Sequence, residues 1–409
     1  MSEMTTMYRS STDLPAFVTG QTLPKNSHAC PNREAALRGL YDSKPEYFDR
    51  LLALSAGEWR KVLRWLDVSG LTLYFADRVN ELNFQGALPG AVNQRLQQNL
   101  SDNRSRMGGL LQECAELHAE FRRANLTYAV VEGFSLFPSS VPMSELRLEH
   151  DLNFLVAEGS ASKTREILEQ AGYRFYAMTG STWKFKKNEA PGFSKNILQK
   201  DGFEQRIELH IESVLPGRKS ALSRREYREI EGIVMPVLAP ADLFLRQGML
   251  LFHEACSPFL RASHLLEFYR NVCVHGDDLA FWTEVRELAE EDPSTVFGLG
   301  VVLQLIESVM QAEIPSKLAM WTMLRLPTAV QRWIALYGVD CVYGTLPGTK
   351  LYLLLQQELE KTGMVFTRSQ REALEFQSIL PRLRFHLVEG LRYAWASYRW
   401  RQYRNGLSA

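Results

Sequence analysis

Hydrophobic and polar residues follow two different periods along this chain, and the change of period divides it into regions. From residue 33 to about residue 83, apolar residues recur every three to four positions, which is typical of amphipathic helices. Residues 91–125 continue this pattern as one long predicted helix. Residues 1–32 are rich in Ser, Thr, Pro and Asn without a sustained period, and they predict a flexible tail.

The middle of the chain has the short apolar and alternating runs that are typical of strands. Residues 126–132 form a compact β-branched run between Asn125 and Gly133, which is typical of a buried strand. Similar short runs predict further strands, with one helix among them at residues 162–171. These strands are expected at residues 151–156, 173–178, 182–187 and 206–212. The pattern predicts an α+β region of roughly 110 residues, which is an ordinary size for one domain.

From residue 239 onward the pattern is helical again. Pro240 and Asp242 stand where helix starts favour them. Further helices are predicted at residues 264–274, 279–288, 301–311, 329–337 and 350–361. The fold class we expect is therefore α+β, with a sheet embedded between N-terminal and C-terminal helical regions. The expected divisions are a tail at 1–32, a helical region at 33–105, an α+β domain at 106–238 and a helical domain at 239–409.

Composition adds few constraints. Apolar residues make up 45% and charged residues 23%, which is ordinary for a globular protein, and 47 basic residues balance 47 acidic ones. Global charge therefore indicates neither a nucleic acid nor an anionic surface as a partner. No apolar run reaches the roughly 18 residues of a membrane span, and the N-terminus lacks a signal-peptide layout. Five scattered cysteines without a C-x-x-C pair predict buried, reduced thiols in a cytoplasmic protein.

Candidate chemistry is concentrated in two of the predicted strands. Because strand side chains alternate, Asp151 and Asn153 lie on one face of the first strand, and Glu208 and His210 share one face of the second. Carboxylates on adjacent strands are suitable ligands for Mg²⁺, which prefers few protein oxygens together with substrate phosphates. We expect Asp151 and Glu208 to be metal ligands and catalytic residues, with Asn153 beside them. The alternative is that they are surface or salt-bridging residues.

Other residues predict contacts to phosphates. Gly133 and Ser135 follow a strand, where a glycine lets backbone N–H groups approach a phosphate and a serine hydroxyl can bond to it. Lys184 and Lys186 share one face of a strand and could meet a triphosphate. A simple turn and a solvated strand face are the alternatives. Taken together, these positions predict phosphoryl or nucleotidyl transfer assisted by a metal.

The order of these motifs resembles the polymerase-β-type nucleotidyltransferase superfamily and, more narrowly, a bacterial family described only as uncharacterised nucleotidyltransferases. The resemblance covers about residues 90–275. Matching positions are Gly133, Arg147, Asp151, Glu208, His210 and His253. It implies a polymerase-β-like mixed sheet, an NTP substrate, and Mg²⁺ or Mn²⁺ as cofactor. It also implies a nucleotide-binding role for Gly133, Ser135, Arg147, Lys184 and Lys186.

Three positions depart from the family pattern. Glu132 stands where the family favours a lysine, Asn153 replaces the second carboxylate, and Glu208 replaces an aspartate. The resemblance implies Mg-dependent transfer of an NMP to a hydroxyl of a small molecule, an RNA end or a protein. The departures leave open a catalytically impaired protein that binds a nucleotide or serves as a scaffold. A helical interaction protein without a ligand is a third alternative.

The last predicted helix is distinctive in composition. Residues 381–406 carry six arginines against a single acid, Glu389, and aromatic residues are interleaved with the arginines. This composition suits nucleic-acid or membrane contact. However, Leu383, Leu387, Leu391 and Trp395 recur at helical spacing. We therefore expect the helix to dock on the rest of the protein through these four residues and to leave its arginines in solvent.

Overall fold

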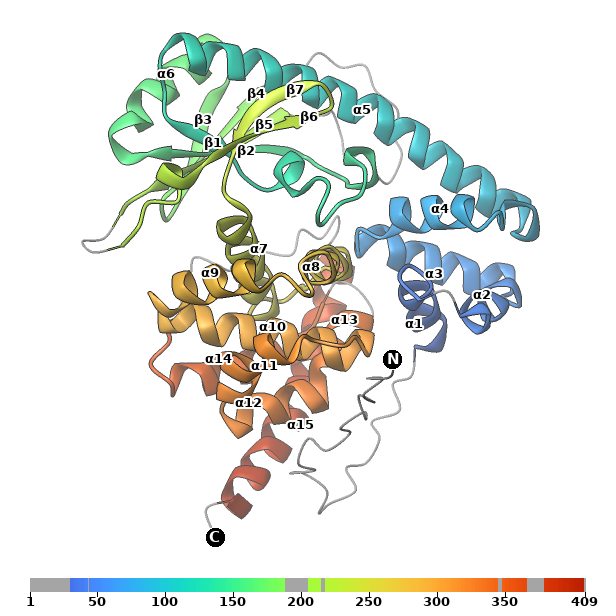
Figure 1. Ribbon diagram of the computed structural model, residues 1–409. Helices are drawn as coiled ribbons and strands as arrows, with labels where there is room; N and C mark the ends of the chain where they lie inside the picture. Colours follow the sequence, from blue (N-terminus) through green and yellow to red (C-terminus); the bar gives the residue numbers. More distant parts are fainter. Residues whose placement is uncertain are drawn as a thin grey trace, which may run out of the picture.

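The computed structural model describes residues 30–42, 44–187, 205–214, 218–344, 348–365 and 379–407. Most of the predicted tail at residues 1–32 lies outside the described residues. Figure 1 shows a sheet covered on one side by a long helix, a group of helices at the N-terminus, and a larger group of C-terminal helices below the sheet. The α+β class is as predicted, and the division into domains stays a prediction.

Four short helices form the N-terminal group. They are α1 (Pro31–Arg38), α2 (Pro45–Leu52), α3 (Ala56–Val68) and α4 (Thr72–Glu81). Local sequence explains their starts, because α1 and α2 begin with proline and α3 begins with a capping box in which Ser55 and Glu58 bond to each other's backbone N–H groups. Trp59 and Leu66 are buried, as the helical spacing predicted.

The helix α5 (Gly90–Arg123) connects the N-terminal helices to the sheet (Figure 1). One stripe of buried residues runs along its whole length. Val92 and Leu96, near its start, belong to the hydrophobic core of the helical parts, whereas Leu110, Leu117 and Phe121 belong to the core beneath the sheet. One helix thus contributes to two cores.

Seven strands form one mixed sheet in the order β3-β4-β5-β2-β1-β7-β6. Their bounds are Tyr128–Val130 (β1), Asp151–Ala157 (β2), Arg174–Thr179 (β3), Thr182–Lys187 (β4), Gln205–Glu212 (β5), Glu226–Ile230 (β6) and Ile233–Val237 (β7). The pairs β2–β5 and β1–β7 are parallel, and all other pairs are antiparallel. The strand pattern did not predict the hairpin of β6 and β7, in which Tyr227 and Val234 are exposed and Pro236 interrupts the run.

The two faces of the sheet have different partners. Leu152, Phe154 and Val156 of β2 point into the core with α5 and α6 (Ala161–Gln170). The opposite face carries Asp151, Asn153 and the polar residues of β4 and β5. Near its centre a small apolar cluster packs it against the start of α7 (Pro240–Ala255). The alternation of residue types along β2 therefore directs its polar side chains away from α5 and towards the C-terminal helices.

The C-terminal helices form the largest core of the protein. They are α8 (Ala262–Val274), α9 (Leu279–Glu290), α10 (Pro293–Met310), α11 (Ser316–Trp321), α12 (Thr328–Trp333), α13 (Val339–Tyr343), α14 (Tyr352–Glu360) and α15 (Ile379–Leu407), following α7. By length and composition alone α10 could span a membrane, although the sequence did not predict such a segment. Most of its residues are buried, which is typical of a central core helix.

Two further expectations need correction. All five cysteines are unpaired, as expected, but Cys273 is exposed and not buried. The helix α15 docks on the C-terminal helices, but through Ala396 and Trp400. The four residues expected at its contact are exposed, at 60% for Leu383, 66% for Leu387, 67% for Leu391 and 64% for Trp395. Both faces of this helix carry apolar residues, so helical spacing alone does not identify the docked one.

Candidate functional site

Polar residues of three neighbouring strands form rows across the sheet face opposite α5. In the registers of β2, β5 and β4, Asn153, Glu208 and Lys184 lie side by side. The next row contains Asp151, Arg206 and Lys186, and the row on the other side contains His210 and Thr182. Directly paired residues of adjacent strands point to the same face. The strand pattern therefore brings together five of the residues predicted for the site.

The carboxyl group of Asp151 is largely buried, and its pKa is raised. Its Oδ1 atom is buried without a hydrogen-bond partner. Burial, followed by the nearby charge of Glu208, raises the pKa of Asp151 to about 6, although the charges of Arg206 and Lys184 act against this shift. An unbonded buried carboxylate oxygen is costly for the fold, so a cation at this position would be stabilised.

Glu208 lies beside Asp151 but already has a cation. Lys184 Nζ donates to Glu208 Oε1 at 2.6 Å, and both side chains are about a quarter exposed. Lys186, one row along, lies over the ring of Tyr176 with its Nζ 5.6 Å from the ring centre. A triphosphate approaching this face would therefore meet lysines that already have contacts, and it would compete for Lys184 with Glu208.

Asn153 is fixed on both sides of its amide. Its side-chain Nδ2 donates to the backbone carbonyl of Asp151 at 3.3 Å. Its Oδ1 accepts from Nε2 of His210 at 3.1 Å, while Nδ1 of His210 lies 3.0 Å from the Thr182 hydroxyl. Burial and the charge of Arg246 lower the pKa of His210 to about 3, so the ring is neutral and one nitrogen donates while the other accepts. The Asn153 side chain therefore accepts a hydrogen bond from a neutral histidine ring.

The turn after β1 holds a glutamate where the phosphate cradle was expected. Gly133 has a φ of +46°, and a Cβ placed on it would lie 3.2 Å from the carboxyl carbon of Glu149. The room beside Gly133 therefore contains Glu149. The hydroxyl of Ser135 is buried and donates to the carbonyl of Glu132 at 2.9 Å. Phosphate contacts at Gly133 and Ser135 stay predictions, and they require Glu149 or the turn to move.

Glu132 is the residue of this turn that faces the site. Its backbone has a φ of +60°, a conformation that costs a non-glycine residue about 1–3 kcal/mol and is concentrated at functional sites. Burial acts to raise the pKa of Glu132, but the charges of its neighbours, Arg246 foremost and Arg147 among them, together with the hydrogen bond from Arg246, lower it by more in total, and the net shift is downward. Arg246 of α7 donates to Glu132 Oε1 at 2.9 Å, and Nε2 of His210 lies 3.9 Å from the same atom. Arg246 of α7 thus neutralises Glu132, at the position where the resemblance implied a lysine.

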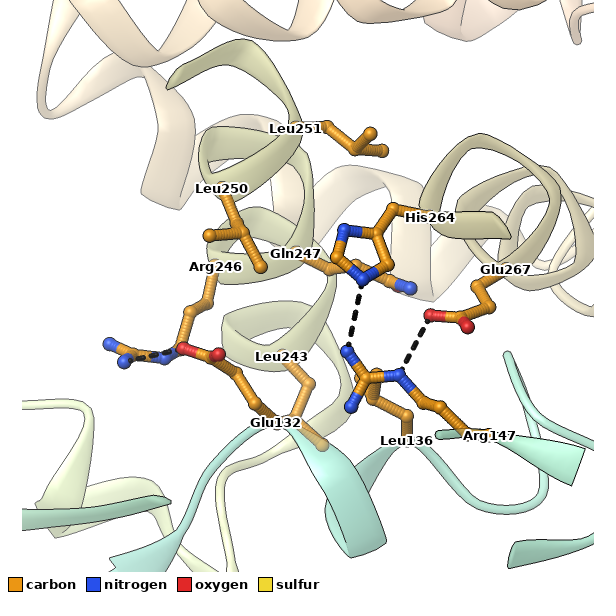
Figure 2. A pocket seen from close by; sticks show the side chains of 10 residues that line it. All are labelled: Glu132, Leu136, Arg147, Leu243, Arg246, Gln247, Leu250, Leu251, His264 and Glu267. Carbon is orange, nitrogen blue, oxygen red and sulfur yellow. Dashed lines mark hydrogen bonds and ion pairs between the residues drawn. The ribbon is translucent and has the colours of Figure 1, made fainter. Parts of the chain in front are cut away.

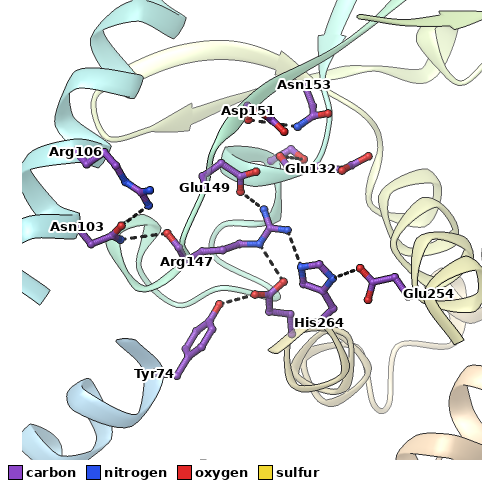
Figure 3. A network of polar contacts seen from close by, with 12 residues as sticks. Tyr74, Asn103, Arg106, Glu132, Arg147, Glu149, Asp151, Asn153, Glu254 and His264 are labelled. Carbon is purple, nitrogen blue, oxygen red and sulfur yellow. Dashed lines mark hydrogen bonds and ion pairs between the residues drawn. The ribbon is translucent and has the colours of Figure 1, made fainter. Parts of the chain in front are cut away.

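Arg147 lies at the centre of a buried polar network (Figure 3). Its guanidinium group forms ion pairs with Glu149 and, at 3.2 Å, with Glu267 of α8, and it also contacts His264. The hydroxyl of Tyr74 in α4 donates to the other oxygen of Glu267 at 2.8 Å. Since the Arg147 side chain is only 11% exposed and fully engaged, its predicted nucleotide-binding role would require these ion pairs to open.

The longest helix positions this network. Asn103, buried in the middle of α5, donates through Nδ2 to the backbone carbonyls of Glu145 and Arg147 at 2.6 and 3.2 Å. These bonds hold the loop that leads into β2. Asp151 is the first residue of β2, so a polar side chain on α5 helps to position it by holding the loop before it.

A narrow cavity lies between the sheet face and α7 (Figure 2). Glu132, Arg147, Arg246 and Glu267 line it together with leucines of α7. Its volume of about 10 Å³ is enough for about one water molecule. A nucleotide cannot enter a cavity of this size.

The donor set fits a magnesium ion held mainly by its substrate. Within the described ranges, no group of three or more His, Cys, Asp or Glu side chains is arranged to hold a metal ion. Asp151, with an unbonded oxygen, and Glu208 are two carboxylates of the kind that Mg²⁺ uses with phosphate oxygens and water. The pair therefore suits a cation that arrives with a nucleotide, and Asn153 has only a neutral oxygen to add.

Several functional candidates were not identified from the sequence. Glu149 could have been found, because it lies two residues before Asp151 and alternation continues the polar face. Arg246, His264 and Glu267 gave no such signal, since they are on helices far along the chain. His253, which the family resemblance had included, lies apart from the rows and lines a second cavity between α7 and the start of α10.

Comparison with known proteins gives one informative match. A family model described as "uncharacterised nucleotidyltransferase" matches residues 55–301, which is more than half of the chain. No curated protein matches the chain. A solved structure, an antigenic nucleotidyltransferase-like protein from Paracoccidioides brasiliensis, matches with 13% identity over 49% of this chain and 91% of that chain. Its TM-score is 0.29.

Proposed function

The chain belongs to the uncharacterised nucleotidyltransferase family, and we propose that it transfers an NMP from an NTP to a hydroxyl group at the face formed by β2, β5 and β4. The observation that carries this proposal is the buried, unbonded Oδ1 of Asp151 beside Glu208. A carboxylate kept in this costly state is more consistent with ligand binding than with a structural role. We further propose that the sheet is of the polymerase-β type.

In the proposed reaction the acceptor oxygen attacks the α-phosphorus of the NTP. The bond between this phosphorus and the oxygen leading to the β-phosphorus breaks, and pyrophosphate leaves. Glu208 takes the proton of the acceptor hydroxyl, because it is the carboxylate of the central row and about a quarter of its side chain is exposed. Lys184, released from Glu208 by that proton, then neutralises charge on the departing pyrophosphate.

Mg²⁺ or Mn²⁺ would be held by Asp151 and one oxygen of Glu208, and it would supply positive charge to the phosphates. Asp151 orients that charge from the start of β2. Asn153 keeps the side chain of His210 and the backbone carbonyl of Asp151 in place through its two hydrogen bonds. Lys186 and Arg206, in the row of Asp151, are positioned to bind the outer phosphates.

The acceptor class is a small molecule, an RNA end or a protein hydroxyl, and balanced global charge favours none of them. A cytoplasmic location is part of the proposal, since it would provide NTP and keep the five unpaired thiols reduced.

A second candidate is nucleotide binding without turnover, and a specific contact favours it. The hydrogen bond from His210 to the Asn153 amide stands where the family has a second carboxylate. The site therefore has one negative charge fewer with which to hold a metal. In this alternative the protein would act as a nucleotide-dependent partner or scaffold.

The test compares wild type with Asn153→Asp, Asp151→Asn and Glu208→Gln. Binding of α,β-methylene-ATP with Mg²⁺ or Mn²⁺ is measured by calorimetry, and pyrophosphate release from each of the four NTPs is measured with glycerol as a model acceptor. Glu229→Gln on the exposed strand β6 is the matched control. Transfer predicts pyrophosphate release by wild type that Asp151→Asn reduces about 10–100-fold or more, which is the range of losses seen around metal ligands.

Each outcome distinguishes the candidates. Release by wild type that Asp151→Asn and Glu208→Gln each reduce about tenfold or more supports transfer. Binding without release by wild type, together with release by Asn153→Asp, supports the second candidate. Absence of binding at millimolar nucleotide in wild type and in Asn153→Asp would contradict both.

A further inference from the structure

One face of α15 exposes a continuous apolar stripe. Leu383, Leu387, Leu391 and Trp395 follow one another at four-residue intervals, and each is 60–67% exposed. Val388 and Tyr398, at 53% exposed each, widen the stripe. Single exposed apolar residues are normal on protein surfaces, but six on one helix are not.

The opposite face of α15 has the contacts that hold the helix in place. Trp400 is buried and its indole N–H donates to Glu358 of α14 at 2.9 Å. Arg392 forms an ion pair with Asp340 at 2.5 Å. Glu389 is buried and accepts from the backbone N–H of Lys350 at 3.2 Å. Because these contacts fix the rotation of the helix, the apolar stripe cannot turn inward without breaking them.

The exposed charges on α15 are all positive. Arg384, Arg399 and Arg401 are exposed next to the stripe, whereas Glu389, the single acid of the helix, is buried and paired. The exposed surface of the described part of α15 is therefore apolar along its centre and cationic beside it. Trp395 and Tyr398, whose rings stack with centres 6.1 Å apart, have an apolar body and a polar tip.

We propose that the stripe of α15 is a membrane-contact surface that binds the headgroup region of a bilayer containing anionic phospholipids. An interfacial helix of this kind places leucines into the acyl boundary, tryptophan and tyrosine at headgroup depth, and arginines against lipid phosphates. Charge complementarity identifies the bilayer as the occupant. The apolar stripe suits the acyl layer, and the exposed arginines beside it, with no exposed acid on the described part of the helix, suit the anionic headgroups.

The same observations disfavour two other occupants. A second copy of this chain would place cationic surfaces against each other, which costs free energy. An RNA would leave the leucines at the centre of the stripe without apolar partners, since nucleic-acid recognition uses basic grooves and stacked aromatic rings.

The position of α15 suits this role. Figure 1 shows that the final turns of α15 (dark red) extend from the C-terminal helices at the end of the molecule far from the sheet. The stripe precedes these final turns, so binding through it would hold the C-terminal helices at a membrane. This inference is independent of the proposed transfer reaction.

The test uses the full chain in vesicle flotation. Vesicles contain equal parts phosphatidylglycerol and phosphatidylcholine, or phosphatidylcholine alone. We expect wild type to float with the anionic vesicles and only weakly with the neutral ones. Leu391→Glu should reduce partitioning about tenfold or more, because one buried leucine is lost and a charge is added. Arg399→Gln should reduce it about fivefold, in anionic vesicles only.

The matched control is Leu324→Glu, at a leucine that is 64% exposed but lies outside α15. It should partition like wild type, and circular dichroism should show that Leu391→Glu remains folded. Phosphatidylcholine brominated on its acyl chains, mixed with phosphatidylglycerol, should quench fluorescence from wild type, and Trp395→Phe should remove that quenching.

Three results would overturn the proposal. One is flotation that is absent, or that Leu391→Glu leaves unchanged. Another is self-association that Leu391→Glu abolishes without any vesicle binding, which would make a second copy the occupant. The third is binding of single-stranded RNA that Arg399→Gln weakens, again without vesicle binding.

Discussion

Two features of the surroundings of Asp151 raise the pKa of its carboxyl group. Its position at the start of β2 buries a carboxylate oxygen without a partner, and its neighbour Glu208 has the same charge. Both effects raise the pKa of Asp151 to about 6 from a usual value of 3.8. The residue therefore destabilises the fold at neutral pH, and we expect that cost to be recovered only when a cation binds.

The first prediction concerns Asp151→Asn. The folded state binds more protons than the unfolded state between pH 3.8 and 6, so wild-type stability falls as pH rises through this window and stays lower above it. The variant lacks this cost and should be more stable than wild type at pH 8, by about 1–3 kcal/mol. The difference should shrink towards pH 4. Urea unfolding at both pH values measures it.

Magnesium provides a second measurement on the same two proteins. A ligand that binds only the folded state raises its melting temperature. Mg²⁺ with α,β-methylene-ATP should therefore raise the melting temperature of wild type and not that of Asp151→Asn. Equal stability of both proteins at pH 8, with equal shifts on adding Mg²⁺, would show that Asp151 has no special environment.

The residues of the strands could be predicted, and the residues of the helices could not. Alternation along β2 and β5 placed Asp151, Asn153 and Glu208 on one face because the period of a strand is fixed by its backbone. The partner of Glu132 is Arg246, 114 positions away, and no local pattern relates the two. The assignment of catalytic and metal-binding roles to these residues stays a prediction.

At the scale of elements, the turn after β1 shows how one element limits another. Gly133 was expected to leave room for a phosphate, and that expectation followed from the small size of glycine. The structure uses the room for the carboxylate of Glu149, which comes from the loop before β2. The sequence around Gly133 predicts that some group comes close to its backbone, but it does not tell whether that group is a phosphate or the side chain of Glu149.

Gly133→Ala should destabilise the protein through this turn. The positive φ costs an alanine about 1–2 kcal/mol, and the added Cβ would press on Glu149. Gly180→Ala is the matched control, because Gly180 also has a positive φ, of +57°, but has no atom within 4 Å of an added Cβ. Urea unfolding should show the larger loss for Gly133→Ala.

Glu149→Ala separates the two causes. In a double-mutant cycle, the loss caused by Gly133→Ala should be smaller when Glu149 is already alanine. Equal losses for both glycine variants, with no coupling to Glu149, would mean that only backbone strain acts at the turn.

At the scale of the whole molecule, one buried network joins all three parts of the chain. Tyr74 belongs to the N-terminal helices, Arg147 to the loop before β2, and Glu267 to the C-terminal helices. The helical periods predicted the elements on either side of the sheet, but not that a charged cluster would hold them together. Buried charges of this kind are stable only when all of their partners are present.

Arg147→Met should therefore be strongly destabilising. It leaves Glu149 and Glu267 buried without their cation, at a cost of about 3–5 kcal/mol. Arg104→Met is the control, because Arg104 is 68% exposed in its ion pair with Glu145 and should contribute at most about 1 kcal/mol. Urea unfolding compares the two variants, and hydrogen exchange should increase in β2 and α8 together only for Arg147→Met. Equal losses would contradict this role for the network.

The continuous buried stripe of α5 sets a limit on how the length of this chain can change. Each residue added to a helix rotates everything beyond it by about 100° and advances it by about 1.5 Å. One residue inserted near Arg104 would keep Val92 and Leu96 in their core but turn Leu110 and Phe121 away from the sheet. It would also move Asn103 or its partners out of register, and with them the start of β2. The residue types at the exposed positions of α5 can vary, but the number of residues in the helix cannot, because it fixes the spacing between the N-terminal helices and Asp151.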